Sequence, residues 1–131
     1  MNVLFDRLFS TQKTKKVFIK YLENKDPLTY ERFLLEIKTT ARYLKILGLK
    51  REDRLVVQIK KSHHVLTIYG ACVQLGIIFI PLNTSYTYSE VDYFLTDLQC
   101  KLFVCESEIE KEIIQNGEEK NYLTKTITND Y

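Results

Sequence analysis

The sequence lacks the glycine-rich motifs that bind phosphate groups. Its four glycines are scattered, and neither G-x-x-x-x-G-K-[ST] nor G-x-G-x-x-G occurs. Both the P-loop and the dinucleotide-binding turn are therefore absent from these residues. The sequence also has no G-x-S-x-G motif, which argues against a hydrolase with a nucleophile elbow.

Cysteine is scarce, and its arrangement predicts reduced, structural thiols. The count of three is odd, and no C-x-x-C pair occurs. Cys72 lies in an apolar run, and Cys100 and Cys105 flank an apolar triplet. If that segment is extended, their Cα atoms lie about 16 Å apart, too far for a disulfide. His63 and His64 are adjacent and lack the spacing of zinc ligands. We therefore expect no metal site and a cytoplasmic protein.

Charge is nearly balanced, which argues against nucleic acid or an acidic membrane surface as a partner. The chain has 19 basic and 17 acidic residues and a net charge of +2. A short basic run at 13–16 is typical of a solvated loop. Asp6 and Arg7 interrupt the apolar N-terminus, so it does not resemble a signal peptide.

One uncharged run, Val65–Leu82, has the length of a membrane span. Thr67, Gln74 and two glycines interrupt it, however, and its second half is β-branched and ends at Pro81. A buried helix, a glycine stop and a buried strand account for the same residues, so we expect no membrane span. Because residues 65–75 are apolar nearly all round, we expect that helix to be buried on both sides.

Apolar periodicity predicts an alternation of strands and helices. Thr29 and Gly48 have the residue types of a helix N-cap and a left-handed C-terminal residue, and Ser62 can cap the third helix. We expect an amphipathic helix at 2–9, with Val3, Leu4, Leu8 and Phe9 on one face, and a hairpin at 17–28. Further helices are expected at 29–47, 65–75, 88–98 and 107–115, and strands at 54–59, 77–80 and 101–105. The apolar face of helix 29–47 consists of Tyr30, Phe33, Leu34, Ile37, Ala41 and Leu44.

This alternation predicts an α/β fold: a partial three-layer βαβαβ unit, with a mostly parallel sheet, helices on both faces and an N-terminal hairpin. The length of 131 residues fits one domain. We assign residues 1–117 to this domain. Residues 118–131 have no clear period, and we expect them to form a polar tail.

The stretch Ile77–Glu90 joins the third strand to the next helix. Thr87 and Glu90 have the spacing of a capping box. In a parallel α/β sheet, such a loop is where a ligand is met. Tyr86 and Tyr88 beside the loop can line a pocket, although packing is the simpler role. Glu90 can act as a catalytic acid, although its capping position already explains it.

Other titratable groups are weaker candidates. His63 and His64 can act as a general base at a helix start, but we favour a polar helix start with one or both side chains in solvent. Asp92 and Asp97 lie off the apolar face of helix 88–98, so we expect both to be solvated.

Three segments resemble core motifs of the adenylate-forming acyl-CoA synthetases. Leu28–Phe33 (LTYERF) resembles L-T-Y-x-E-L, with Arg32 in place of the usual acid. Leu47–Leu55 (LGLKREDRL) resembles G-V-x-x-G-D-R-V, and Val73–Asn83 (VQLGIIFIPLN) resembles L-K-A-G-x-x-Y-V-P-L-N. They occur in the family's order and at family-like separations.

The finer resemblance is to malonyl-CoA synthetases. Pro81–Thr87 (PLNTSYT) followed by Glu90–Asp97 (EVDYFLTD) is similar to their P-L-N-T-A-Y-T and E-L-D-Y-F-x-x-D. Many acyl-CoA ligases instead have an arginine at the position of Ser85, where it meets the phosphates of CoA. We therefore assign no CoA contact to Ser85. The resemblance extends over roughly residues 3–106.

The resemblance implies a two-step ligase reaction. A carboxylate attacks ATP to give an acyl-adenylate and pyrophosphate, and CoA then displaces AMP, with magnesium and a lysine stabilising phosphate charge. In the family, the phosphate loop, the adenine-binding segment, the ribose-binding aspartate and the C-terminal lysine all lie further along the chain. We therefore name no catalytic, cofactor-binding or metal-binding residue here. ATP, magnesium and CoA are implied only for an intact ligase.

Three hypotheses follow. The first is an N-terminal part of a malonyl-CoA-synthetase-like ligase, inactive alone. The second is one half of a split ligase, completed by a separate chain that carries the remaining segments. The third is an independent small α/β binding module, which predicts a monodisperse domain without an exposed apolar surface.

Overall fold

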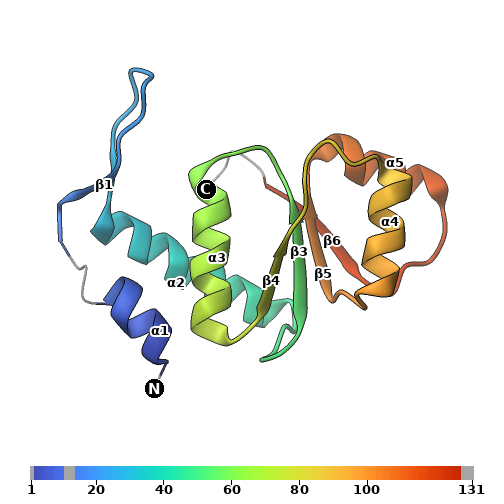
Figure 1. Cartoon of the computed structure of the whole chain (residues 1–131), viewed down its shortest axis with the longest axis horizontal. Coiled ribbons are helices and arrows are strands. Elements are labelled where there is room, and N and C mark those ends of the chain that lie inside the picture. Colours follow the sequence, from blue (N-terminus) through green and yellow to red (C-terminus); the bar gives the residue numbers. More distant parts are fainter. Residues whose placement is uncertain (1, 11–13, 128–131) are drawn as a thin grey trace. The chain divides into compact units, whose positions relative to one another are not determined.

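The computed structural model describes residues 2–10 and 14–127 of the chain (Figure 1). The chain forms two compact units, Met1–Lys50 with Ser62–Gly76, and Arg51–Lys61 with Ile77–Tyr131. The structure confirms the mixed α/β class: a four-stranded parallel sheet is flanked by helices, and an antiparallel hairpin precedes them.

The first unit contains the predicted hairpin and three helical segments. Strands β1 (Val17–Ile19) and β2 (Leu28–Thr29) pair antiparallel, with Val17 opposite Thr29. The helical segments are α1 (Val3–Phe5) with the π-helical turn η1 (Asp6–Ser10), α2 (Tyr30–Ile46) and α3 (His63–Leu75).

The N-terminal helix is present, but its predicted apolar face is wrong. Phe5 is the buried residue, whereas Val3, Leu4 and Leu8 are about half exposed. Val3 and Leu4 precede the π-helical turn, so the helix presents a different face to the core from the one predicted, with Phe5 at its centre. Phe9, the fourth residue of the predicted face, does pack inward, with its ring centroid 5.5 Å from that of Phe5.

Helix α2 has the predicted caps and the predicted apolar face. The Thr29 hydroxyl accepts a hydrogen bond from the Arg32 amide at 3.2 Å, and Gly48 follows the helix with φ +88°. The buried stripe consists of Phe33, Leu34, Ile37, Ala41 and Leu44.

Helix α3 differs from the prediction in two ways. Ser62 stands at the N-cap but makes no capping hydrogen bond. The helix is also not buried on both sides, because Leu66 remains 41% exposed. It packs closely on α2 at Gly70, where an added Cβ would lie 2.5 Å from Ile37 Cδ1. Glycine is therefore required for the α2–α3 approach.

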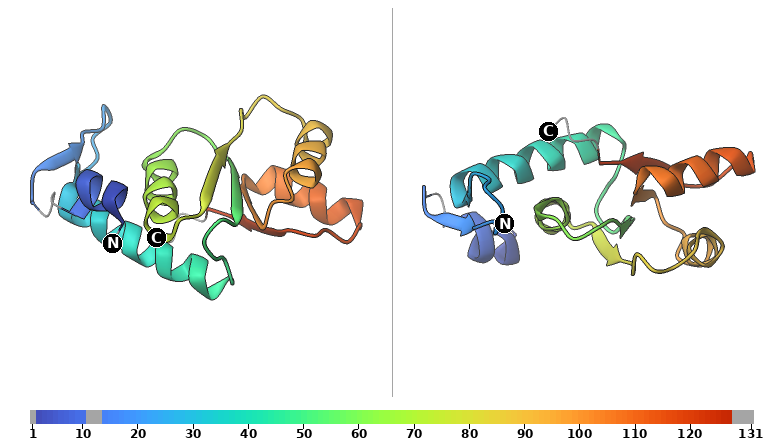
Figure 2. Two further views of the ribbon diagram at one scale, coloured as in Figure 1. Left: turned by 60° about the horizontal axis from the view of Figure 1, so that its bottom comes forward. Right: turned by 90° about the horizontal axis from the view of Figure 1, so that it is seen from above.

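The second unit is built on a parallel sheet of strand order β4-β3-β5-β6 (Figures 1 and 2). The strands are β3 (Arg54–Gln58), β4 (Ile78–Pro81), β5 (Leu102–Cys105) and β6 (Leu123–Thr126). Helix α4 (Tyr88–Asp97) connects β4 to β5, and α5 (Ser107–Asn116) connects β5 to β6.

Both faces of the central strands β3 and β5 are buried. One face contributes Val56, Phe103 and Cys105, which form a core cluster with α4 and α5 residues. The alternate side chains, Leu55 and Val57 among them, are buried as well. Such strands read as continuous apolar runs, which is why the sequence predicts them clearly.

Residues 118–131 do not form only a polar tail. Residues 123–126 are strand β6, which pairs parallel to β5 with Leu123 opposite Leu102. The prediction missed β6 because an edge strand is half exposed and carries Thr and Lys, so its sequence has no apolar run. Residues 128–131 lie outside the described residues.

The uncharged run Val65–Leu82 is divided as predicted. It supplies most of α3, then Gly76 in the left-handed region with φ 71°, then β4. None of the helices that the structure describes combines the length and apolar character needed to cross a membrane.

Candidate functional site

The loop after β4 is held by a buried amide at the end of β3. Gln58 is only 2% exposed. Its Nε2 donates to the carbonyl oxygens of Asn83 and Tyr86, both at 3.0 Å. The Leu82 amide also donates to the Val57 carbonyl at 2.8 Å. The loop is therefore anchored at the carboxyl edge of the sheet, where the sequence placed a candidate ligand loop.

The same loop ends in the predicted capping box. The Thr87 amide donates to Glu90 Oε2 at 2.8 Å, and the Glu90 amide donates back to the Thr87 hydroxyl. Asn83 accepts a hydrogen bond from the Ser85 amide at 2.9 Å, which tightens the preceding turn. Glu90 thus has the capping role that the sequence favoured over acid catalysis.

A hollow of about 340 Å³ opens on the outer side of α4. Its walls are aromatic, with the rings of Tyr86 and Phe94 5.5 Å apart and those of Tyr93 and Phe94 6.0 Å apart. Tyr88, the other candidate, instead packs partly buried against the core of the second unit. The lining residues are Tyr86, Ser89, Glu90, Tyr93 and Phe94.

The charge around this hollow does not fit a phosphate ligand. The sequence has no lysine or arginine between Lys61 and Lys101, and Glu90 places a carboxylate in the lining. Phosphate groups are normally met by Lys, Arg or several converging backbone amides. The residues present therefore do not fit the phosphates of ATP or CoA at this position.

Asp92 was predicted to be solvated, but the structure gives it two hydrogen-bond partners. Its Oδ1 accepts hydrogen bonds from Lys120 Nζ at 3.1 Å and from the Tyr122 hydroxyl at 3.0 Å. Burial raises the pKa of Tyr122, and the Asp92 carboxylate raises it further. These contacts tie α4 to the segment before β6, which the sequence analysis had treated as a tail. Asp97 is exposed as predicted.

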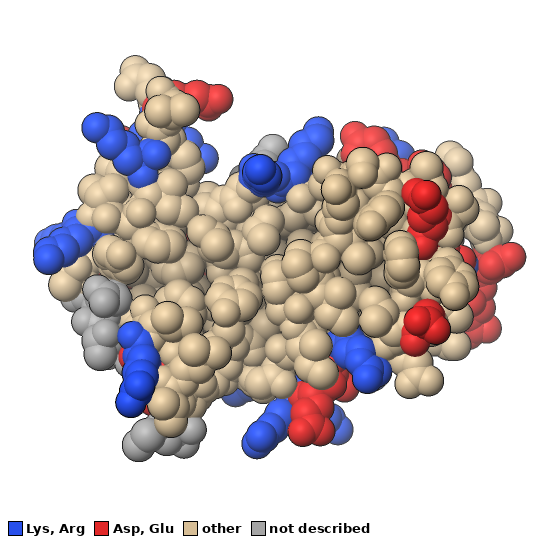
Figure 3. Space-filling view, viewed as in Figure 1, with Lys and Arg blue, Asp and Glu red and all other residues tan. Residues whose placement is uncertain are grey.

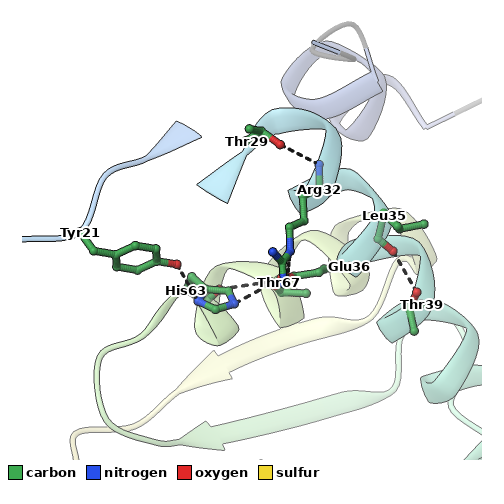
Figure 4. A network of polar contacts seen from close by, with 8 residues as sticks. All are labelled: Tyr21, Thr29, Arg32, Leu35, Glu36, Thr39, His63 and Thr67. Atoms are coloured by element: carbon green, nitrogen blue, oxygen red, sulfur yellow. Dashed lines mark hydrogen bonds and ion pairs between the residues drawn. The ribbon is translucent and has the colours of Figure 1, made fainter. Parts of the chain in front are cut away.

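His63 takes part in a polar network in the first unit (Figure 4), and the His64 ring centroid lies 4.2 Å from that of His63. The Tyr21 hydroxyl lies 3.0 Å from His63 Nδ1, and His63 Nε2 lies 3.3 Å from Glu36 Oε2. Thr67 donates to the same carboxylate at 3.4 Å. His63 is therefore partnered and mostly buried, rather than the solvated residue that the simpler prediction described.

This network resembles a carboxylate–imidazole–hydroxyl relay, but the raised pKa of Tyr21 argues against its hydroxyl as a nucleophile. Burial raises the pKa of Tyr21, and the Glu36 carboxylate raises it further. Activation of a nucleophile requires a lowered pKa or a base that removes the proton into a substrate site. Burial also lowers the pKa of His64, with His63 as the next cause. The contacts instead connect the hairpin loop to α2 and α3.

The three cysteines are free, buried thiols, and burial raises the pKa of each to about 12. Reactive cysteines have a lowered pKa and partial exposure, so these thiols are structural. Among residues 2–10 and 14–127, no group of three His, Cys, Asp or Glu side chains could hold a metal ion.

Sequence reasoning missed Gln58, Tyr21 and Glu36. Gln58 had a detectable signal, since a glutamine within the apolar strand 54–59 must find partners when buried. Tyr21 and Glu36 had no such signal, because their contacts depend on the packing of segments distant in sequence.

Comparison with known proteins gives one family. The model of the AMP-binding enzyme family matches residues 5–130. A fatty acid–[acyl-carrier-protein] ligase from Streptomyces coeruleorubidus, ScoC, is 35% identical over 81 residues, which are 62% of this chain and 16% of that protein.

Solved structures give the same family. Apo MatB from Rhodopseudomonas palustris superposes with a TM-score of 0.85 and 31% identity, over 96% of this chain and 25% of MatB. A benzoate CoA ligase from Burkholderia xenovorans shares the fold, with a TM-score of 0.78 at 17% identity over 97% of this chain and 25% of that one. The chain thus spans about a quarter of these proteins, at the N-terminal part of MatB. It belongs to the family of AMP-binding enzymes.

Proposed function

We propose that this chain is the N-terminal part of an AMP-forming acid–CoA ligase similar to malonyl-CoA synthetases. The observation that carries the proposal is the likeness to MatB, a malonyl-CoA synthetase: the identity is 31% over 96% of this chain, with a TM-score of 0.85. The motif Pro81–Thr87 supports it, because this motif forms an anchored loop and a capped helix rather than an irregular surface segment.

The role of this part is structural. It supplies a parallel sheet and the anchored β4–α4 loop, while the groups that bind ATP, magnesium and CoA belong to other parts of an intact ligase. The sequence has no P-loop, and the hollow on α4 carries a carboxylate instead of a basic side chain. The chain alone therefore does not catalyse the conversion of ATP, a carboxylate and CoA to acyl-CoA, AMP and pyrophosphate.

The test is a pyrophosphate-release assay. The purified chain is incubated with ATP, magnesium, malonate and CoA, with MatB from Rhodopseudomonas palustris as the positive control. We expect no release above the protein-free background. Sustained turnover by the purified chain would refute its inactivity.

A second candidate is one half of a split ligase that a separate chain completes. One observation favours it: Leu66, an apolar residue of the largely apolar helix α3, is 41% exposed. The neighbouring reading frames are searched for S/T-G-T-T-G-x-P-K-G, and the encoded chain is mixed with this one. Pyrophosphate release by the mixture, but by neither chain separately, would support a split enzyme. Absence of such a reading frame would exclude the split-ligase hypothesis.

We further propose a cytoplasmic location. Three buried thiols without a disulfide fit a reducing compartment. Alkylation of freshly lysed, unfolded protein should modify all three thiols, and an oxidised fraction would contradict the proposal.

A further inference from the structure

We propose that the hollow on α4 binds an arginine side chain of a protein partner. The hollow is the one defined above, lined by Tyr86, Ser89, Glu90, Tyr93 and Phe94. The proposal does not depend on the ligase assignment, because it rests only on the aromatic walls, the fixed carboxylate and the local charge.

The aromatic walls offer ring faces to a cation. Tyr93 is 70% exposed and Tyr86 is 38% exposed, which is unusual for large aromatic side chains. The Phe94 ring lies between them, tilted by 51° to Tyr86 and by 67° to Tyr93. A guanidinium group stacks on such faces and is more weakly hydrated than an ammonium group, so arginine fits this hollow better than lysine.

The carboxylate of Glu90 is held in place before any ligand arrives. Its Oε2 accepts hydrogen bonds from the Thr87 amide at 2.8 Å and from the Thr87 hydroxyl at 3.1 Å. Oε1 accepts neither bond and is the oxygen that a guanidinium would meet. Asp97 lies one helical turn beyond Tyr93 but is not part of the lining, so Glu90 is the carboxylate of the hollow.

The surroundings favour a cation over an anion. No lysine or arginine occurs between Lys61 and Lys101, whereas α4 alone contains three acidic residues. Of these, Asp92 is paired with Lys120 at 3.1 Å. Arg54 Nη1 donates to the Leu98 carbonyl at 3.1 Å, at the C-terminal end of α4 beside Asp97. The charge in the lining of the hollow therefore comes from Glu90. Figure 3 shows that mainly acidic side chains gather over the part of this surface that carries α4 and α5.

The site is also preorganised, which lowers the entropic cost of binding. The buried Gln58 amide holds the Tyr86 carbonyl at 3.0 Å, so the loop side of the hollow is fixed. The helix side is fixed by Val91 and Leu95, which are buried in the core. An exposed site of this kind binds one side chain weakly, so we assign the arginine to a partner polypeptide whose other contacts add affinity.

The test uses a capped Gly-Arg-Gly peptide titrated into the 131-residue chain, followed by two-dimensional amide NMR. We expect the Tyr93 and Phe94 amide resonances to shift, with a dissociation constant of about 1 mM. The matched peptides contain citrulline, which keeps the shape but lacks the charge, or lysine. Citrulline should abolish the shifts, and lysine should weaken binding about two- to fivefold.

Two variants identify the groups responsible. Glu90→Gln removes the charge but keeps a capping oxygen, and Tyr93→Ala removes one ring; each should weaken arginine binding about two- to fivefold. Tyr43→Ala, which removes a tyrosine of α2, is the matched control and should change nothing.

Three results would overturn the proposal. The first is equal binding of the arginine and citrulline peptides. The second is an absence of shifts at any peptide concentration in wild-type protein that gives a dispersed spectrum. The third is a shift of the Tyr93 resonance with protein concentration alone, because a second copy would then occupy the hollow.

Discussion

The close approach of α2 and α3 at Gly70 predicts the effect of adding one methyl group. In Gly70→Ala, the new Cβ would lie 2.5 Å from Ile37 Cδ1 and 2.8 Å from Ile37 Cγ1. Real Cβ atoms do not approach other carbon atoms so closely, so α2 or Ile37 must move. Ile37 has no exposed surface, which leaves its side chain little room.

The magnitude follows from two opposing effects. Overpacking a filled core costs typically about 1–3 kcal/mol, and two contacts below 3 Å place this site in the upper part of that range. Alanine has a higher helix propensity than glycine by about 1 kcal/mol. We therefore expect Gly70→Ala to lower the free energy of unfolding by about 1–2 kcal/mol, although it improves the helix propensity of α3.

The assay is urea unfolding followed by circular dichroism, in a double-mutant cycle with Ile37→Ala. That change removes both clashing atoms, and alone it should cost about 2–5 kcal/mol. In the Ile37→Ala background, Gly70→Ala should be neutral or stabilising, because only the helix propensity remains. If Gly70→Ala stabilises the wild type, or costs the same in both backgrounds, the steric reasoning is wrong.

Three further predictions concern the other contacts described above. Thr87→Ala should lower the free energy of unfolding by about 1 kcal/mol in urea titrations because it removes the α4 cap, whereas an unchanged midpoint would show that the cap is dispensable. Gln58→Leu should speed hydrogen exchange at the Tyr86 amide, since the loop loses two hydrogen bonds, and unchanged exchange would refute the anchoring role. Burial lowers the pKa of His64 in the folded state. The contribution of His64 to the free energy of unfolding is therefore present above the unfolded pKa of about 6.5 and is lost as the pH falls below it. The urea midpoint should be lower at pH 5.5 than at pH 7.5, and this difference should be smaller in His64→Gln.

The sequence correctly predicted the elements that have a clear local pattern of apolar and capping residues. Helix α2 was predicted with its caps and its buried stripe, because a 3.6-residue period, Thr29 and Gly48 all indicate the same helix. Strands β3 and β5 were predicted because both of their faces are buried, which gives continuous apolar runs.

The errors occurred where distant segments decide the structure. Strand β6 depends on β5 for its partner, and its own residues give no strand signal. The Tyr21–His63 contact joins residues 42 positions apart. The hollow on α4 was predicted only in part, because Tyr86 was proposed as a pocket residue but Tyr93 and Phe94 were not. The i, i+3, i+4 pattern assigns a residue to one face of a helix, but it does not show whether another segment covers that face.

The strand order β4-β3-β5-β6 has a consequence for how this chain folds during synthesis. Strand β3 is made first, yet it lies inside the sheet and needs partners on both edges. Its two neighbours, β4 and β5, arrive only after α3 and α4 have been made, and β6 is added last at the outer edge. Parallel pairing requires long loops to close before any contact is gained. The β3 edge that faces β4 can pair once α3 and β4 have been made, but the edge that faces β5 remains unpaired until β5 has left the ribosome. Chaperones that bind extended apolar segments should therefore meet this chain between the synthesis of β3 and that of β5.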